Sequence, residues 1–472
     1  MGGSFHIEHF GCRAARADGE AIAERLLAGG LCERQAGEAD VVVVNTCSVT
    51  AEADREARAF IRRAHRVNPA ARIVATGCYA QRVPEELAEL AGVSAVVGNS
   101  HKAFAPEVVL GLVEQRTSLQ HRLVQIQAAD GPLVLADDRF AHSFLEEAQV
   151  APGSQTRPNL KVQEGCGNRC TFCVIPQTRG SSRSLPADKV LAQVRGFVAA
   201  GGKELVLSGI NLGRWGRDLK PPEAGVPATL AELVRSILER TELARLRLSS
   251  IEPMDWGGEL IALMAEFGGT RLARHAHLPL QSGSDAVLRR MHRRYRPWHY
   301  EQRVAELVDA AGPALTLGAD VMVGFPGETD REFEETMEFV RSLPFGYLHL
   351  FPFSTRPGTR AWALHAESPV PPQAVQERMS ALRLLNVEKS REHRGRFVGG
   401  ILDAISLHTP TAISRRGRTS ALTENFLPLE IAGELPANQL VRVSLETLGA
   451  DGILRGSAAT VALEPETVCA AV

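Results

Sequence analysis

Strand-like and helix-like segments alternate along the first hundred residues of this chain, and that alternation limits the folds open to it. The run from Asp40 to Val44 is almost entirely β-branched, which is typical of a strand buried on both faces. Further strands are predicted at residues 4–10, 72–75 and 93–97, and helices at residues 16–28, 52–67 and 85–91. Such alternation predicts a parallel, doubly wound sheet.

A second alternating region follows a weaker stretch that starts near Leu112 and ends in linker-like residues 151–154. Its predicted strands are residues 160–163, 203–208, 245–250, 275–279, 315–323 and 347–353, with helices between them such as 187–200, 230–240 and 300–311. Repeated βα units wind right-handed and close toward a barrel. In a barrel of this type the active site forms at the carboxyl ends of the strands.

Three cysteines follow the first strand of this second region with the spacing C-x-x-x-C-x-x-C: Cys166, Cys170 and Cys173. Three thiolates on one short loop can surround a metal centre, but all-cysteine zinc and iron sites need a fourth ligand. The neighbouring sequence offers no fourth Cys or His. The spacing therefore favours an iron cluster with one open iron, and a zinc knuckle with a distant fourth ligand stays open as the alternative.

A second set of cysteines occupies one topological position in the first region. Cys12, Cys47 and Cys78 each stand just after a predicted strand. The carboxyl ends of parallel strands lie along one edge of a sheet, so we expect these three side chains to converge. A single cysteine is usually a small core residue, but three in equivalent positions predict a second cluster site. Cys32 and Cys469 have no such context.

Composition is that of a soluble globular protein, with 472 residues, 44% of them hydrophobic and 23% charged. Apolar runs fall short of the ~20 residues of a membrane span, and the first residues lack signal and myristoylation patterns. We therefore expect a cytoplasmic protein with no membrane partner, whose 8 cysteines do not form a disulfide framework, so that metal-ligand thiolates are the default role for them. The net charge of −2 excludes a uniformly basic nucleic-acid binder but permits local basic patches.

Two regions contain the arginines that could contact phosphates. The basic run at residues 289–296, which includes Tyr295, is either a solvated helix end or a phosphate-binding segment with a ring for base stacking. The last region has short predicted strands at residues 397–408, 427–431, 440–444 and 452–455, which predict a small β-barrel. It carries Arg391, Arg394, Arg396, Arg415, Arg416 and Arg418. A purely structural end domain is the alternative.

The cysteine loop and its flanks resemble the radical S-adenosylmethionine (SAM) methylthiotransferases. The matching residues are Lys161-Val162-Gln163, Thr171-Phe172, Ile175-Pro176, Arg179-Gly180 and Ser182-Arg183-Ser184. Within the family they look most like the MtaB type, the branch that modifies threonylcarbamoyladenosine in tRNA. Asn45-Thr46-Cys47 and Gly77-Cys78-Tyr79 are similar to cysteine motifs of the family's amino-terminal domain. The first motif departs, because Ala15 stands where the family usually has Asn.

The resemblance implies three domains in an α/β chain. They are an amino-terminal methylthiotransferase domain (residues 1–125) with a doubly wound parallel sheet, a partial (β/α)6 radical SAM barrel (151–386) and a small β-barrel (390–465). Residues 423–430 of the last domain resemble the RNA-binding TRAM domain. Several strands of the central region end in polar or Gly-rich turns. By resemblance, these supply the implied SAM contacts Gly209, Ser250, Gln281 and Gly324.

The resemblance also implies two 4Fe–4S clusters and SAM as cofactors. Cys166, Cys170 and Cys173 would hold the cluster whose open iron binds SAM, and Cys12, Cys47 and Cys78 the cluster that carries or supplies sulfur. SAM cleavage would give a 5′-deoxyadenosyl radical that abstracts a hydrogen atom, and a second SAM would supply the methyl group. The implied partners are the anticodon stem-loop of tRNA, an electron donor such as flavodoxin or ferredoxin, and a sulfur donor.

Three alternatives stay open on sequence alone. Sister branches of the family act on isopentenyladenosine in tRNA or on an aspartate of a ribosomal protein. A non-catalytic iron–sulfur protein that binds RNA or transfers electrons is the third. The six cysteines and the polar turns favour an enzyme over this last class.

Overall fold

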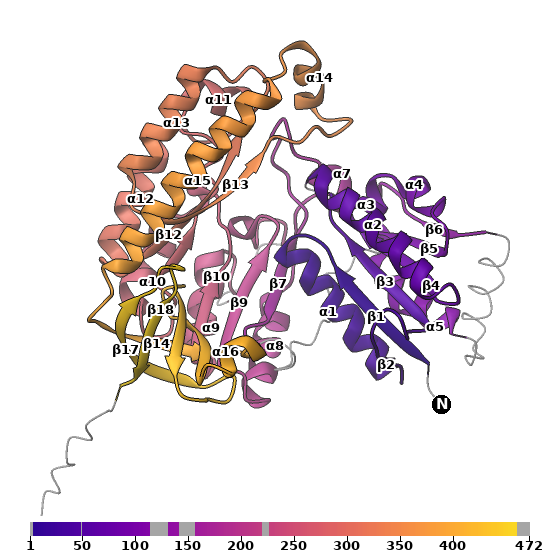
Figure 1. The fold of residues 1–472 in the computed structure, drawn as a ribbon, viewed down its shortest axis with the longest axis horizontal. Helices are drawn as coiled ribbons and strands as arrows, with labels where there is room; N and C mark the ends of the chain where they lie inside the picture. Colours follow the sequence, from indigo (N-terminus) through magenta and orange to yellow (C-terminus); the bar gives the residue numbers. More distant parts are fainter. Residues whose placement is uncertain (1–2, 49, 114–130, 141–155, 220–225, 460–472) are drawn as a thin grey trace, which may run out of the picture.

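The computed structural model describes residues 3–48, 50–113, 131–140, 156–219 and 226–459 of the chain. Figure 1 shows an amino-terminal α/β domain beside a larger central α/β domain, with a small β-barrel at the lower end of the central domain. The expected linker at residues 151–154 lies outside the described residues. Within those ranges, no helix combines the length and the apolar character that a membrane crossing requires.

The amino-terminal domain is built on a six-stranded parallel sheet in the order β2-β1-β3-β4-β5-β6. Its strands are β1 Ser4–His9, β2 Cys32–Glu33, β3 Val41–Thr46, β4 Arg72–Gly77, β5 Val93–Gly98 and β6 Leu133–Leu135. Val41 and Val43 of β3 enter the hydrophobic core on one face, and Val42 and Val44 enter the core on the other. The predicted doubly wound sheet is therefore confirmed.

Helices cover both faces of this sheet. One face carries α1 Arg13–Ala28 and α5 Ala105–Leu112, and the other carries α2 Ala51–Val67, α3 Cys78–Arg82 and α4 Pro84–Ala88; the 3₁₀ helix η1 Asn99–Phe104 follows β5. The helix expected at residues 85–91 ends early, because Gly92 adopts φ +85° and turns the chain into β5. The edge strands β2 and β6 were not predicted, since two or three residues are too few to show a period.

The central domain contains the six predicted parallel strands, which are β7 Asn159–Glu164, β9 Glu204–Gly209, β10 Arg245–Leu248, β11 His275–His277, β12 Thr316–Val323 and β13 Phe345–Pro352. Strands β10, β9 and β7 form one sheet, with β8 Arg183–Ser184 as its antiparallel edge, and β11, β12 and β13 form another. A parallel bridge joins Leu246 of β10 to Leu272, three residues before β11, so the two sheets lie edge to edge. The strands thus make a partial barrel.

Helices surround the outer side of this barrel, as Figure 1 shows for α12, α13 and α15. The helices of the domain are α7 Ile175–Arg179, α8 Ala187–Ala199, α9 Leu230–Arg240, α10 Gly258–Phe267, α11 Asp285–Arg290, α12 Pro297–Ala311, α13 Asp330–Ser342, α14 Arg360–Glu367 and α15 Pro372–Gly395, with 3₁₀ turns η2 Leu212–Arg214 and η3 Pro253–Asp255. Their apolar faces and the strands share one large core. The helix α9 begins at a capping box, in which Thr229 accepts from the amide of Glu232 at 3.2 Å.

The last domain is a closed five-stranded barrel in the order β14-β15-β16-β18-β17. Its elements are β14 Ile401–Ser406, α16 Thr411–Ser414, β15 Arg418–Thr423, β16 Pro428–Ala432, β17 Leu440–Leu448 and β18 Leu454–Ala458. The predicted barrel is confirmed, but the strand expected from residue 397 begins at Ile401 because α15 continues to Gly395. The sequence pattern also missed β15.

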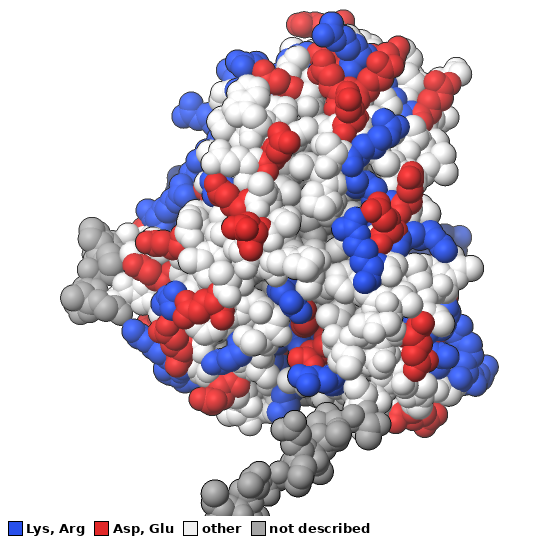
Figure 2. Space-filling view, turned by 90° about the vertical axis from the view of Figure 1, so that its left-hand side faces the viewer, with Lys and Arg blue, Asp and Glu red and all other residues white. Residues whose placement is uncertain are grey.

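Residues 423–426 dock this barrel onto the central domain. Glu424, 1% exposed, pairs with Arg274, whose Nε lies 2.9 Å from the carboxylate. The ring of Phe426 stacks on His275 with 4.3 Å between centroids. The segment with the weak TRAM resemblance is therefore buried between domains. On the face shown in Figure 2, basic and acidic side chains are interspersed, and neither sign forms a large area.

Candidate active site

The loop that carries Cys166, Cys170 and Cys173, called the first trio below, begins directly after β7. Gly165 starts the loop with φ +70°, and a Cβ atom there would lie 2.0 Å from the carbonyl oxygen of Ser181. Only glycine fits this position. The amide of Cys166 then donates to the carbonyl oxygen of Gly180 at 3.1 Å, which joins the two ends of the loop. Backbone geometry thus fixes where the first sulfur stands.

Hydrogen-bond donors approach the sulfur atoms of the first trio. Asn211 Nδ2 lies 3.4 Å from Cys166 Sγ, and Arg293 Nη1 lies 3.3 Å from Cys170 Sγ. Burial raises the pKa of the Cys173 thiol to about 12, so a thiolate there needs a strong positive partner such as a metal ion. Donors directed at sulfur, together with a desolvated thiol, fit the ligand set of a metal cluster.

Arg293 and Tyr295 correct one reading of the basic run at residues 289–296, that of a phosphate-binding segment with a stacking ring. Arg293 is 7% exposed and pairs with Glu252 at 2.8 Å. Tyr295 is fully buried, and its hydroxyl donates to the carbonyl oxygen of Pro279 at 2.6 Å. Because Tyr295 does not reach the surface, it cannot stack on RNA. Arg293 instead belongs to the cysteine site.

One cavity, of about 670 Å³, lies where the cysteine loop faces the carboxyl rim of the barrel. All three cysteines of the first trio line it, and so does Cys12 from the amino-terminal domain. Its volume falls within the roughly 300–1,000 Å³ of small-molecule sites. The two domains therefore share one space of the size of a small-molecule site.

Three of the four predicted SAM contacts line this cavity, namely Gly209, Ser250 and Gln281. Gly324 does not. Its amide donates to Glu328 at 2.8 Å, and a Cβ atom there would lie 2.6 Å from the side chain of Val375. The conformation of Gly324, with φ +77°, therefore serves the turn after β12 and not the cavity wall.

The second trio, Cys12, Cys47 and Cys78, stands at the carboxyl edge of the amino-terminal sheet. Cys47 and Cys78 follow directly paired strand residues, because Thr46 of β3 is the partner of Gly77 of β4. A Cβ atom on Gly11 would lie 2.4 Å from Cys47 Sγ, so the turn before Cys12 packs on that side chain. Cys47 and Cys78 are buried and Cys12 is exposed. The fold thus brings the three loops together.

Arg179, at the end of α7 in the central domain, reaches into this second trio. Its Nε donates to Cys78 Sγ at 3.2 Å, and its Nη1 contacts Asp18 at 3.1 Å and Glu164 at 2.6 Å. Burial by itself lowers the pKa of the guanidinium, but Cys78, Glu164, Asp18 and Cys12 raise it well above its usual value. A permanent positive charge therefore acts on two of the three sulfurs.

The same guanidinium belongs to a buried charge network that joins the two domains. Asp18 of α1 pairs with Lys102 at 2.6 Å and with Lys161 of β7, which also pairs with Glu164. With every group ionised, three cations face two carboxylates, so one positive charge is in excess beside Cys78.

Ala15, where the family usually has Asn, lies against an amide from another strand. The Nδ2 atom of Asn45 donates to the backbone carbonyl of Ala15, which is 2% exposed. Asn45 stands two residues before Cys47. The amide of Asn45, in β3, therefore contacts the segment after Cys12, where the family usually has an Asn of its own.

Several residues of this site were not predicted from the sequence. Asn99 donates to Cys78 Sγ at 3.4 Å and to the carbonyl oxygen of Thr178 at 2.8 Å. The basic run at residues 289–296 indicates Arg293 only as a phosphate ligand, and Asp18 has no motif around it. The sequence signal for Arg179 is its place in the matching flank after the cysteine loop. That signal does not predict the contact of Arg179 with Cys78.

Comparisons with known proteins agree with this architecture. The Radical SAM superfamily matches residues 160–340, and a family described as Uncharacterized protein family UPF0004 matches residues 4–98. The solved structure of the radical S-adenosylmethionine methyltransferase TsrM from Kitasatospora setae superposes with a TM-score of 0.55 over 78% of each chain, at 16% identity. This likeness supports the fold alone.

Curated relatives span almost the whole chain. Threonylcarbamoyladenosine tRNA methylthiotransferase MtaB of Aquifex aeolicus is 36% identical over 93% of this chain and 98% of its own length. The protein of the same name from Bacillus subtilis is 35% identical over 94% of each. The tRNA-2-methylthio-N(6)-dimethylallyladenosine synthase of Cereibacter sphaeroides is 34% identical over 83% of this chain and 85% of its own length. The chain is therefore a transferase that belongs to the MtaB-type tRNA methylthiotransferases of the radical SAM superfamily.

Proposed function

We propose that this enzyme methylthiolates N6-threonylcarbamoyladenosine next to the anticodon of tRNA, forming the 2-methylthio derivative. The observation that carries the proposal is the shared cavity, which is lined by Cys12 of the second trio and by the whole first trio. A sulfur-carrying site and a SAM-binding site must both reach the same nucleoside in this reaction. The names of the relatives from Aquifex aeolicus and Bacillus subtilis supply the substrate.

Membership of the radical SAM superfamily implies a 4Fe–4S cluster and SAM. In this proposal the first trio holds that cluster, and Gly209, Ser250 and Gln281 contact SAM from the carboxyl rim of the barrel. When bound, these cofactors supply the radical and methyl chemistry that side chains cannot provide. Arg293, fixed by Glu252, holds the Cys170 sulfur in place with a charged donor.

The second trio would hold a second 4Fe–4S cluster that carries or supplies the inserted sulfur. Support comes from the convergence of its three loops and from Arg179, whose Nη2 atom is buried without a hydrogen-bond partner in the described part of the chain. A buried guanidinium N–H without a partner, on the residue whose Nε contacts Cys78, fits a bound anionic group. An external electron donor and a sulfur donor complete the proposal.

The carboxy-terminal barrel is proposed to contact the tRNA. Arg415 and Arg416 are exposed there, and Arg396 is exposed just before it at the end of α15; Arg416 also pairs with Glu430 at 2.8 Å and Arg396 with Glu392 at 2.6 Å. Arg394 has a structural role instead, since it donates to the carbonyl oxygen of Gly452 at 2.6 Å. Exposed arginines of this kind position a phosphate backbone without reading sequence.

The test is nucleoside mass spectrometry of tRNA from a deletion strain with and without the plasmid-borne enzyme. We expect the 2-methylthio derivative of threonylcarbamoyladenosine to disappear in the deletion strain and to return with the plasmid. Restoration of the methylthio derivative of isopentenyladenosine instead would reassign the substrate to the branch of the Cereibacter sphaeroides relative. About eight irons per reconstituted chain would support two cubane clusters, and about four would contradict the second.

A further inference from the structure

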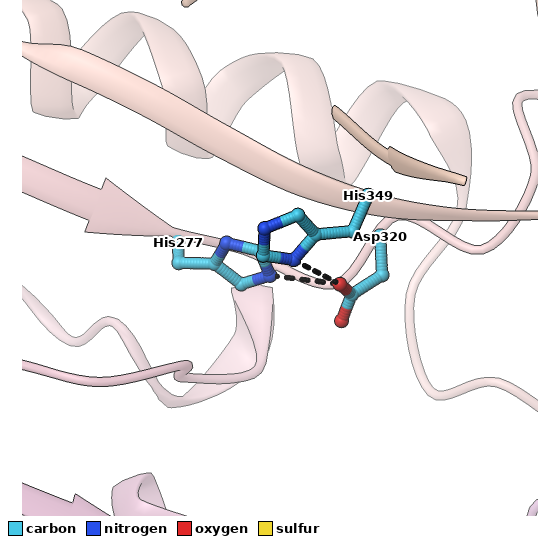
Figure 3. A group of neighbouring side chains, drawn as sticks. All are labelled: His277, Asp320 and His349. Carbon is cyan, nitrogen blue, oxygen red and sulfur yellow. Dashed lines mark hydrogen bonds and ion pairs between the residues drawn. The ribbon is translucent and has the colours of Figure 1, made fainter. Parts of the chain in front are cut away.

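Three polar side chains on neighbouring strands line the cavity, and Figure 3 shows them close together. His277 ends β11, and Asp320 and His349 are cross-strand partners in β12 and β13. Asp320 stands three residues before the end of β12, and its backbone carbonyl accepts from the amide of Gln281 at 2.7 Å, just beyond the end of β11. This polar group, here called the acidic triad, lines the cavity where β11 ends.

Both imidazoles of the acidic triad contact the same carboxylate oxygen. His277 Nε2 lies 3.1 Å and His349 Nδ1 lies 3.3 Å from Asp320 Oδ1. The other oxygen, Oδ2, receives no hydrogen bond from any residue that the structure describes. Burial by itself raises the pKa of Asp320, but the two imidazoles lower it below its usual range, so the carboxylate is ionised. The cavity thus presents a free, charged hydrogen-bond acceptor.

A second layer of contacts fixes the orientation of the acidic triad. The hydroxyl of Tyr347 lies 3.0 Å from Nδ1 of His277 and 2.8 Å from Nε2 of His275. Gly318 is the cross-strand partner of Tyr347, and a Cβ atom there would lie 2.1 Å from the tyrosine ring. The missing side chain at position 318 therefore makes room for the ring that holds His277. Such outer contacts are typical of a preorganised binding site.

We propose that Asp320, oriented by His277 and His349, binds an exocyclic N–H group of the target adenine through Oδ2. This inference rests on the proposed function, because it requires a modified adenosine to enter the cavity. The N6 nitrogen of adenine keeps one hydrogen when it carries a carbamoyl group, and the carbamoyl group adds another N–H beside it. Nearby apolar residues, Met322, Phe351 and Phe353, limit competition from water.

Two other ligands could use the same three side chains. SAM also contains an adenine with an exocyclic amine, and the three ligand atoms of the acidic triad lie within 4.8 Å of one another, a spacing that would suit a divalent metal ion. Because Gln281, a proposed SAM contact, donates its backbone amide to the carbonyl oxygen of Asp320 at 2.7 Å, the SAM-affinity measurement below is what separates the two ligands. The contacts already made to Oδ1 leave Oδ2 as the open atom, which favours one hydrogen-bond donor over a metal that needs all three groups.

The test compares the reconstituted holoenzyme with its Asp320→Asn, Asp320→Ala and His349→Gln variants on an anticodon stem-loop that contains threonylcarbamoyladenosine. His349, with 57% of its side chain exposed, tolerates substitution and guards against misfolding of the Asp320 variants. The matched control is Asp309→Asn, an exposed carboxylate on α12. We expect methylthio product to fall roughly tenfold or more, since a hydrogen bond to a charged group is lost, while SAM affinity changes by less than about twofold.

Each other result has a defined meaning. Unchanged product formation in the Asp320 variants overturns the inference. A parallel loss of SAM affinity assigns the carboxylate to the cofactor and also overturns it. The inference is also overturned if the wild-type holoenzyme binds one zinc ion after equilibration with a zinc salt and the Asp320→Ala variant does not. Lack of product with the wild-type enzyme would instead reject the proposed function itself, so the two failures are distinct.

Discussion

The Nε atom of Arg179 donates to the sulfur of Cys78 at 3.2 Å, across the boundary between the central and amino-terminal domains. The two residues are 101 positions apart in the sequence. Arg179 lies six positions after Cys173, so one short segment carries both the last sulfur of the first trio and a cation for the second trio. The two cysteine sites are therefore connected in two ways, by the Arg179–Cys78 hydrogen bond and by the cavity that both sites line.

Arg179→Lys tests that coupling. Lysine keeps the charge but cannot reach Cys78, Asp18 and Glu164 at once, because it lacks the planar fork of arginine. On the proposal that each trio holds one 4Fe–4S cluster, we expect iron per reconstituted chain to fall from about eight toward about four, with the cluster of the first trio retained. Iron analysis and electron paramagnetic resonance of the reduced protein measure this.

The control for that experiment is Arg235→Lys, in an arginine whose side chain is 41% exposed and pairs with Glu266 at 2.7 Å. It should leave both the iron content and the spectrum unchanged, since exposed ion pairs contribute little. If Arg179→Lys matched this control in both measurements, the guanidinium would have no role at the second trio.

Asp18→Asn tests the buried charge network at the domain boundary. The change leaves Lys102, Lys161 and Arg179 with Glu164 as their only carboxylate within that network. Breaking a buried ion pair typically costs about 3–5 kcal/mol, so we expect a loss of that order in the free energy of unfolding at pH 7. Urea denaturation of the variant and the wild-type protein measures it.

The pH dependence of this loss has a definite sign. Burial raises the pKa of Asp18, but the three neighbouring cations outweigh it and lower the folded-state pKa below the usual range. The stabilisation is therefore present above the unfolded-state pKa of ~3.9 and is lost as the pH falls below it. The difference between wild type and Asp18→Asn should shrink as the pH is lowered from about 5 toward 3. A constant difference would contradict this assignment.

The sequence predicted those parts of the fold that depend on local pattern. The β-branched run 40–44 predicted a doubly buried strand, and cysteines placed just after strands predicted where loops meet, because strand ends of a parallel sheet share one edge. The contact between Arg179 and Cys78 depends instead on how two domains dock, which no local period records. Tyr295 shows the same limit: an aromatic ring inside a basic run suggested RNA stacking, but tertiary packing buries it.

Gly165→Ala tests the turn that begins the first cysteine loop. The residue has φ +70°, and its new methyl group would lie 2.0 Å from the carbonyl oxygen of Ser181, so the loop must shift. We expect the cluster of the first trio to be lost and SAM cleavage to 5′-deoxyadenosine to stop. Gly167→Ala is the matched control in the same loop, because a Cβ atom there meets nothing within 4 Å. Equal iron content in the two variants would refute the geometric argument.

Glu424→Ala tests whether residues 423–426 hold the carboxy-terminal barrel in place. The carboxylate is 1% exposed and pairs with Arg274, which is 27% exposed, so the loss is smaller than for a fully buried pair. We expect destabilisation of about 1–3 kcal/mol and faster proteolysis between α15 and β14, because the barrel then separates more often from the central domain. Limited proteolysis followed by mass spectrometry locates the cleavage.

The control is Glu434→Ala, which removes an exposed carboxylate of the same domain and should be cleaved at the wild-type rate. Identical cleavage of the two variants would show that apolar packing, such as the stack of Phe426 on His275, holds the barrel without this ion pair.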